Sequence, residues 1–158
     1  MNNFKGAIST KIPVQWGEMD AFNHVNNVVY IRWCETARIE LFRNIWGNKG
    51  INMKEILEGS GVGPILANFN VNYKIPISYP DQVIIQTRVA HIGNSSFNVE
   101  HQVFSEKLGN RIVAEASSVV VMLNYKTGKK FKLTVSLKSA LESYKLWTIV
   151  NFFVSLYK

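Results

Sequence analysis

The sequence predicts an α+β fold in which one long helix is wrapped by an antiparallel sheet. Residues 27–46 carry apolar side chains at helical spacing around more than half of the expected helix, so other elements must cover it. Beyond residue 66, four segments alternate apolar and polar residues and are separated by short turns, which is typical of an antiparallel meander. Such a sheet buries the helix best by curling around it.

The first half of the chain supplies one strand, one polar loop and the helix. A strand is expected over 8–16, where apolar residues alternate and Pro13 favours a sheet edge. The polar loop 18–26 follows, and the helix begins at Asn27. Another loop is expected over 58–64, and its glycines do not suit a phosphate cradle because a strand rather than a helix follows them.

The second half supplies the meander and a closing helix. Strands are expected at 67–77, 82–92, 96–104 and 111–125, with hairpin turns at 93–95 and 108–110. The closing helix is expected over 134–145, with Thr134 or Ser136 as its N-cap. With 158 residues and 47% apolar content, the chain is expected to form one domain, 1–145. The apolar segment 146–158 is expected to be a helical tail and not a separate domain.

Composition and charge limit the expected cellular location and the kinds of partner. The single cysteine, Cys34, and an N-terminus without a secretory signal predict a reducing, cytoplasmic location. Cys34 occupies a helical core position, so a buried thiol is expected. No apolar segment reaches the ~20 residues that a membrane-spanning helix needs. The net charge of +7 favours anionic partners without choosing among them.

The residues with the clearest chemistry lie in the polar loop 18–26 and the first turn of the helix. Asp20 and His24 stand just before a helix whose first unpaired backbone amides fall near Asn26 and Asn27. A carboxylate placed there can attack a thioester carbonyl or take a proton from water, while the amides stabilise charge on the carbonyl oxygen. The same residues also suit purely structural roles as turn formers and helix caps. Residue types alone leave both explanations open.

This stretch contains three short motifs: Gly17-Glu18-Met19-Asp20, His24-Val25-Asn26-Asn27 and Tyr30-Ile31-Arg32-Trp33. Together they resemble the signature of the 4-hydroxybenzoyl-CoA thioesterase-like group of hotdog-fold acyl-CoA thioesterases. The expected order of strands and helices through about residue 144 also fits, so the resemblance covers most of the chain. It is specific over residues 14–38 and architectural beyond them, and the apolar tail is not part of the pattern.

The resemblance implies a hotdog fold, hydrolysis of an acyl-CoA thioester, and homodimers or homotetramers with active sites between subunits. It also implies that Asp20 is the nucleophile or general base and that the Asn27 amide polarises the thioester carbonyl. His24 and Asn26 are expected to shape or hydrogen-bond the site, and Tyr30 to contact the substrate.

A related branch of the same fold uses a carboxylate further along the helix, which makes Glu35 the second candidate catalyst. The structural alternative for Glu35 is an ion pair within the helix, with Arg32 or Arg38. No cofactor is expected, since coenzyme A is part of the substrate. No motif assigns its phosphate contacts. On charge alone the candidates are Arg88, Lys126, Lys129, Lys130 and Lys132, which otherwise form a solvated basic face.

Other functions fit the sequence less well. The three histidines lack zinc-ligand spacing, and the Gly-x-Ser-x-Gly elbow of serine hydrolases is missing. A hotdog dehydratase pairs its histidine and acid differently, and nucleic-acid binding is disfavoured because the lysines do not interleave with the aromatics. The alternative that remains is a non-catalytic module binding acyl-CoA or an acyl carrier protein. The acyl chain is not specified, although medium or long aliphatic chains are preferred over aromatic groups.

Overall fold

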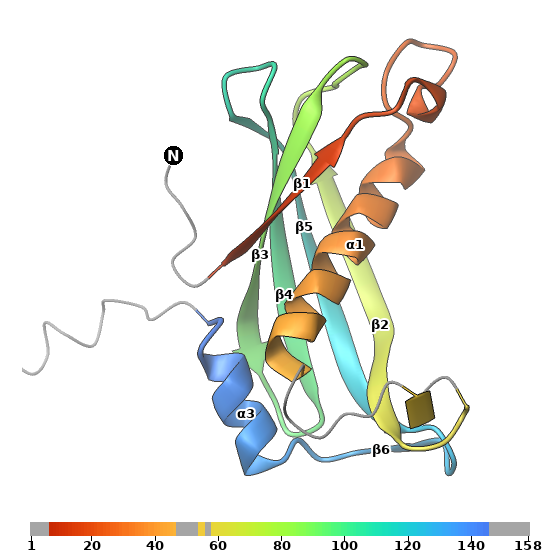
Figure 1. Cartoon of the computed structure of the whole chain (residues 1–158), viewed down its shortest axis with the longest axis vertical. Helices are drawn as coiled ribbons and strands as arrows, with labels where there is room; N and C mark the ends of the chain where they lie inside the picture. Colours follow the sequence, from red (N-terminus) through yellow and green to blue (C-terminus); the bar gives the residue numbers. More distant parts are fainter. Residues whose placement is uncertain (1–6, 47–53, 56–57, 146–158) are drawn as a thin grey trace, which may run out of the picture.

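A curved antiparallel sheet wraps around helix α1 in the computed structural model, which describes residues 7–46, 54–55 and 58–145 (Figure 1). The strands are β1 (Ile8–Pro13), β2 (Val62–Tyr73), β3 (Gln82–Ile92), β4 (Ser96–Ser105), β5 (Arg111–Asn124) and β6 (Lys129–Lys130). The other elements are η1 (Trp16–Glu18), α1 (Asn27–Trp46) and α3 (Val135–Glu142). No helix among the described residues is long and apolar enough to cross a membrane.

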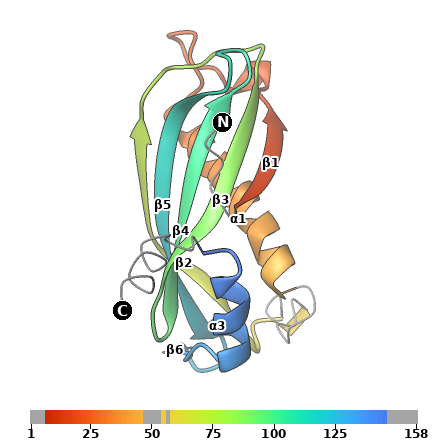
Figure 2. The same ribbon diagram turned by 90° about the vertical axis from the view of Figure 1, so that its left-hand side faces the viewer.

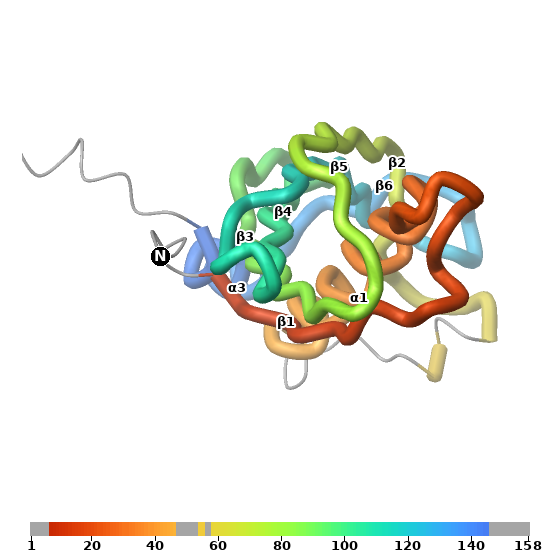
Figure 3. The backbone as a smooth tube through the Cα atoms, turned by 90° about the horizontal axis from the view of Figure 1, so that it is seen from above, coloured from red at the N-terminus to blue at the C-terminus, as the bar shows by residue number. Residues whose placement is uncertain are grey.

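The strands follow the order β1-β3-β4-β5-β2, and β6 pairs with the end of β5. Seen along the long axis, the sheet runs round α1 from β1 to β2, so the helix lies inside the curve (Figure 3). Every ladder between these strands is antiparallel. The predicted α+β class with a sheet wrapped around one central helix is therefore confirmed.

The core between α1 and the sheet consists of two apolar clusters. The first surrounds the start of α1 and includes Val29, Tyr30, Trp33 and Ala37 with Ile85, Val103 and Ala116. The second surrounds the end of α1 and includes Leu41 and Ile45 with Val89, Val99 and Val120. Helix α3, at the lower end of the molecule, adds Leu137 and Leu141 to the second cluster (Figure 2). Burial of these side chains is the main force holding α1 against the sheet.

A band of buried polar residues separates the two clusters. Helix α1 and strands β3, β4 and β5 each contribute one member, which lies between a residue of the first cluster and a residue of the second. The members are Arg38, Thr87, His101 and Ser118. Thr87 Oγ1 and His101 Nδ1 share a hydrogen bond of 2.9 Å. Burial, reinforced by the nearby Arg38 charge, lowers the pKa of His101 from 6.5 to about 3. This imidazole is therefore neutral in the folded protein at physiological pH.

Two predicted strands had wrong boundaries. The first strand ends at Pro13 and not at Trp16, which lies in η1 with 75% of its surface exposed. The strand expected over 67–77 is β2, which begins at Val62, within the predicted loop 58–64, and ends at Tyr73. Pro64 is tolerated there because β2 is an edge strand and needs no amide on its open side.

The remaining elements match closely. Helix α1 has the predicted bounds, and both hairpin turns join the expected strands. Of the two possible caps for α3, Thr134 is the one observed, with Oγ1 accepting from Leu137 N at 3.2 Å. The short strand β6 was not predicted. The tail 146–158 lies outside the described residues, so its predicted helix and the division at residue 145 stay predictions.

The neutral His101 predicts acid sensitivity of the fold. Because its folded pKa, about 3, lies below its ordinary value of 6.5, unfolding takes up a proton as the pH falls between these values. Through His101, each unit by which the pH falls in this range lowers the free energy of unfolding by about 1.4 kcal/mol. Urea unfolding of wild type and His101→Gln between pH 7 and pH 4.5 measures this, with a shallower slope expected for the variant. Parallel pH profiles for the two proteins would contradict it.

Candidate active site

The polar loop between η1 and α1 is a small closed hairpin. A single antiparallel bridge joins Met19 and Val25, and Asp20 N donates to His24 O at 2.7 Å. At the base of the hairpin, Asn26 N donates to Glu18 O at 2.9 Å. These bonds fix the loop directly against the first turn of α1, which lies at the upper end of the molecule in Figure 1.

Asp20 uses one carboxylate oxygen to build this hairpin. Its Oδ1 accepts from Phe22 N at 2.8 Å and from His24 N at 3.3 Å, as in an Asx turn. The turn also holds Asn23 at φ 61°, a left-handed conformation that asparagine tolerates well. The structural role foreseen for Asp20 is therefore real, and it leaves the second oxygen, Oδ2, without a hydrogen-bond partner among the described residues.

The start of α1 is capped by Asn26. Its Oδ1 accepts from Val28 N at 3.1 Å, and its carbonyl accepts from Val29 N at 2.9 Å. Asn26, rather than Asn27, is thus the cap. The amide of Asn27 has no acceptor among the described residues, so it remains available at the positive end of the helix dipole. Both Asn26 and Asn27 are exposed.

Two residues that the sequence analysis did not propose support this arrangement. Glu18 accepts from Gln15 N at 2.9 Å and from Trp33 Nε1 at 3.3 Å, and it lies 3.7 Å from the Arg32 guanidinium. It therefore fastens the hairpin to one side of α1. Tyr73, at the end of β2, donates its hydroxyl to Asn27 O at 3.0 Å. Glu18 stands in the first sequence motif, whereas nothing in the sequence links Tyr73 to Asn27.

The other predicted site residues lie in different settings. His24 is exposed on the returning arm of the hairpin, opposite Asp20. Tyr30 is only 3% exposed and packs edge-on against Tyr73, with ring centroids 5.2 Å apart. Burial, together with the charges of Tyr73 and Asp81, raises the pKa of Tyr30 to about 12. Within this single chain Tyr30 is thus a core residue with a neutral hydroxyl. It lies about one helical turn after Asn27.

Glu35 lies two turns beyond Asn27 and is paired. Its Oε1 is 3.7 Å from Arg38 Nη2, the second of the two partners anticipated for it, while Arg32 turns to Glu18 instead. The Glu35 side chain is 63% exposed, but the Arg38 side chain is only 6% exposed. Glu35 is therefore the counter-ion of a buried guanidinium, and no hydrogen bond or ion pair among the described residues joins it to the hairpin.

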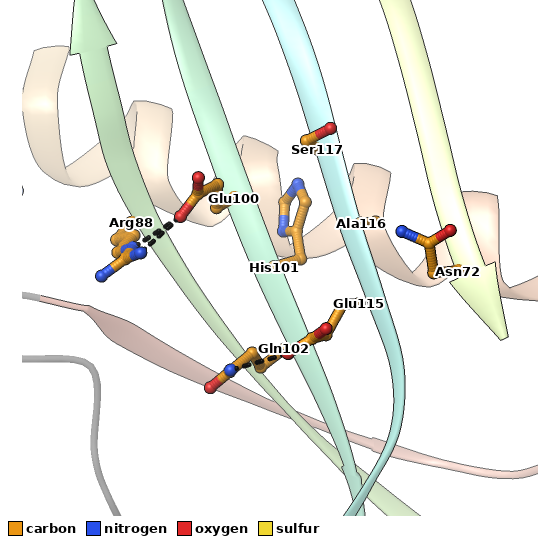
Figure 4. Close-up of a pocket in the computed structure, with 8 residues that line it drawn as sticks. All are labelled: Asn72, Arg88, Glu100, His101, Gln102, Glu115, Ala116 and Ser117. Carbon is orange, nitrogen blue, oxygen red and sulfur yellow. Dashed lines mark hydrogen bonds and ion pairs between the residues drawn. The ribbon is translucent and has the colours of Figure 1, made fainter. Parts of the chain in front are cut away.

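A polar cavity of about 280 Å³ lies across the face of the sheet turned away from α1 (Figure 4). Its charged groups are largely paired with one another. Arg88 binds Glu100 at 2.5 Å, and Glu115 accepts from Gln102 at 3.1 Å and contacts Lys74 at 2.6 Å. Arg88, considered above as an anion contact, is thus already neutralised. No cluster of three or more metal-ligating side chains occurs within the described residues.

Comparisons with known proteins identify the family of this chain. The model of the thioesterase-like superfamily matches residues 14–141, a span that includes the hairpin, α1 and the whole meander. The long-chain acyl-CoA thioesterase FadM of Escherichia coli is 25% identical over 135 residues, which cover 85% of this chain and 97% of the relative. A chloroplastic acyl-acyl carrier protein thioesterase of Arabidopsis thaliana is 28% identical over 69% of this chain but only 54% of its own length.

Solved structures show the same fold. A thioesterase from Thermus thermophilus, solved with coenzyme A and Zn, superposes with a TM-score of 0.73 and 26% identity, covering 91% of this chain and 96% of that one. These findings confirm the hotdog-type fold and the predicted class of enzyme, a thioester hydrolase. The chain belongs to the thioesterase-like superfamily.

Proposed function

We propose that this protein hydrolyses an acyl-CoA thioester to the free acid and coenzyme A, with Asp20 as nucleophile or general base. The observation that carries the proposal is the hairpin itself. It holds Asp20 by one oxygen, leaves the other oxygen without a partner among the described residues, and is bonded to the residue that caps α1. The Asp20 carboxylate and the open Asn27 amide thus belong to one short hydrogen-bonded unit.

In the reaction, the acyl carbonyl oxygen is placed at the Asn27 amide, where the helix dipole stabilises developing negative charge. Asp20 Oδ2 then follows one of two routes. It adds to the carbonyl carbon and expels the thiolate, leaving a mixed anhydride that water cleaves, or it takes a proton from water, which attacks instead. Both routes end with the acid, the thiol of coenzyme A and Asp20 restored.

Glu35 is less suited to this step. Its carboxylate already neutralises Arg38, whose side chain is buried, and withdrawing that charge would leave the guanidinium without its counter-ion. His24 is proposed to contact substrate rather than to act as the base, because it lies exposed on the hairpin and no side-chain hydrogen bond among the described residues orients its ring. Asn26 positions the Asn27 amide through the helix cap. Tyr30 is proposed to contact the acyl group of the substrate.

Coenzyme A is the preferred carrier of the acyl group. FadM, an acyl-CoA thioesterase, aligns over almost its whole length, whereas the carrier-protein thioesterase aligns over about half of its length. The carrier-protein substrate is therefore the alternative. The chemistry proposed for Asp20 requires no cofactor. A cytoplasmic location stays a prediction that rests on the sequence.

We also propose that the active form is a homodimer or homotetramer. Strand β2 has β5 on one side and no neighbouring strand on the other among the described residues. Its side chains Ile65, Leu66 and Tyr73 are each more than 40% exposed, and Val28 on α1, close to the site, is 54% exposed. An open edge beside exposed apolar groups is a surface that a second copy would cover.

The catalytic proposal predicts that Asp20→Asn lowers the rate of thioester hydrolysis by two orders of magnitude or more, because the amide can neither attack nor take a proton. Free thiol released from a panel of acyl-CoAs measures the rate. Glu35→Gln is the comparison variant: because it removes the counter-ion of Arg38, its folding is checked by circular dichroism, and the folded fraction is expected to retain most activity. Normal turnover by Asp20→Asn with an inactive, folded Glu35→Gln would move catalysis to the helix.

The assembly proposal predicts that Leu66→Asp dissociates the oligomer, because two like charges then meet where β2 is covered. Light scattering coupled to size exclusion should give a multiple of the 18.0 kDa chain mass for wild type and a single chain for the variant. Val135→Asp, at a position on α3 that is 87% exposed, is the control and should leave the mass unchanged. A monomeric wild-type protein would contradict the proposal.

A further inference from the structure

The segment 146–158 is an apolar stretch that the proposed function does not use. It lies outside the described residues, after the last helix, α3, and after residue 141, where the family match ends. Nine of its 13 residues are apolar, none is acidic, and Lys145 and Lys158 stand at its two ends. The fold that the family shares therefore does not explain why this segment is apolar.

The polar residues of the segment recur with the period of an α-helix. They are Thr148, Asn151, Ser155 and Lys158, separated by three, four and three positions. At roughly 100° per residue, these positions fall within an arc of about 80°, and every other residue of the segment lies outside that arc. The sequence therefore predicts an amphipathic helix with a broad apolar face and a narrow polar face.

The length and the ends of the segment are typical of a helix that lies on a membrane. Its 13 residues are fewer than the ~20 that a membrane-spanning helix needs. Trp147 and Tyr157 stand near its two ends, and such side chains concentrate at the level of the lipid headgroups. The pattern suits a helix in the plane of the interface, with its apolar face among the acyl chains of the lipids.

The chain before the segment supplies positive charge. From Asn124 to Lys158 the sequence contains seven lysines and one acid, Glu142, which lies 3.4 Å from Lys145. Strand β6 and helix α3, which carry three of the lysines, lie at the same end of the molecule (Figure 1). The surplus of cations attracts an anionic lipid surface. Among the described residues, five of the lysines form no ion pair: Lys126, Lys129, Lys130, Lys132 and Lys138.

The segment begins at a fixed point on the side of the sheet away from β2. Val89 N donates to Tyr144 O at 3.0 Å, and Lys145 forms a parallel bridge with Val89. Strand β3, which contains Val89, lies beside β1, whereas β2 is the last strand at the opposite edge. A second copy that pairs with β2 therefore does not cover the point where the segment begins.

Beside this point the described fold offers no exposed apolar surface for the segment to cover. Large apolar side chains that are exposed among the described residues lie on other elements, and none lies on β1, β3 or β4. The one on α3, Val135, stands at the opposite end of that helix from Tyr144. The apolar face predicted for 146–158 therefore points to a partner outside the domain.

We infer that the segment 146–158 binds the surface of an anionic phospholipid bilayer. Thr148, Asn151 and Ser155 face water, and the remaining side chains enter the boundary between headgroups and acyl chains. The inference goes beyond the proposed function, because it concerns where the protein works and not which bond it breaks. Long-chain acyl-CoA is itself an amphiphile that enters bilayers, so the docked enzyme and such a substrate would share one surface.

Co-sedimentation of the full chain with vesicles tests the docking. Wild type should bind vesicles of phosphatidylcholine with about 30 mol% phosphatidylglycerol roughly tenfold more tightly than vesicles of phosphatidylcholine alone. High salt should reduce this difference, because it screens the lysines from the lipid charge. Absence of binding to the anionic vesicles, or equal affinity for the two kinds of vesicle, would overturn the inference.

Two matched double variants test whether one face of the segment carries the binding. Ile149→Asn/Phe153→Asn places two amides on the apolar face and should weaken vesicle binding about a hundredfold, because two buried apolar side chains are lost. Thr148→Asn/Ser155→Asn places the same amides on the polar face and should change the affinity by no more than about twofold. Equal losses in the two variants would contradict the predicted helix and its docking.

Two further measurements exclude other partners and separate the docking from the proposed reaction. Ile149→Asn/Phe153→Asn should keep the wild-type mass in light scattering and the wild-type rate with hexanoyl-CoA, which is too short to require a bilayer. A change of mass with unaltered vesicle binding would show that the segment joins copies of the chain, and would refute the docking. Vesicle binding by a protein that hydrolyses no acyl-CoA would refute the proposed reaction and support the docking.

Discussion

The hydrogen bond from Asn26 N to Glu18 O is the contact on which the rest of the site depends. It closes the hairpin that carries Asp20 and at the same time fixes the residue that caps α1. In the proposed reaction, the Asp20 carboxylate and the Asn27 amide that would stabilise the developing oxyanion therefore share one short segment of chain. Preorganisation of this kind needs no movement during the reaction, which is why fixed amides lower the barrier so effectively.

The central helix serves both stability and chemistry. Its buried side packs two apolar clusters against the sheet, and the polar band between them includes Arg38, whose charge is balanced from the surface by Glu35. Glu35 is thereby committed to the fold. Only the first turn of the helix, where Asn26 supplies the cap and the next amide stays open, is left for substrate. The two candidate carboxylates therefore differ in role: Glu35 on α1 stabilises the fold, whereas Asp20 on the preceding hairpin is the one proposed to act on substrate.

Much of the fold could be predicted because its signals are local. The bounds of α1 follow from apolar spacing, and the meander follows from alternation and turn residues. The errors fell where tertiary context decides. Pro64 lies within β2 because an edge strand tolerates it, and Trp16 leaves the sheet because Glu18 closes a turn at Gln15. Neither the edge position of β2 nor the bond between Glu18 and Gln15 can be derived from the sequence alone.

The sequence was enough to name the candidate site residues, which stay predictions, but not to show how they are connected. Asp20, His24 and Asn27 lie within eight positions, so their proximity is a local property of the chain. The contact of Tyr73 with Asn27 joins residues 46 positions apart. Such relations appear only when the sheet is folded, and those between chains only when two copies meet.

The most direct test is a crystal structure with a thioether analogue of an acyl-CoA that keeps the carbonyl group but cannot be hydrolysed. The account predicts that the carbonyl oxygen lies about 2.7–3.1 Å from Asn27 N, with an oxygen of Asp20 about 3–3.5 Å from the carbonyl carbon or joined to it by one water. A carbonyl group bound against Glu35, with Asp20 turned into solvent, would contradict it.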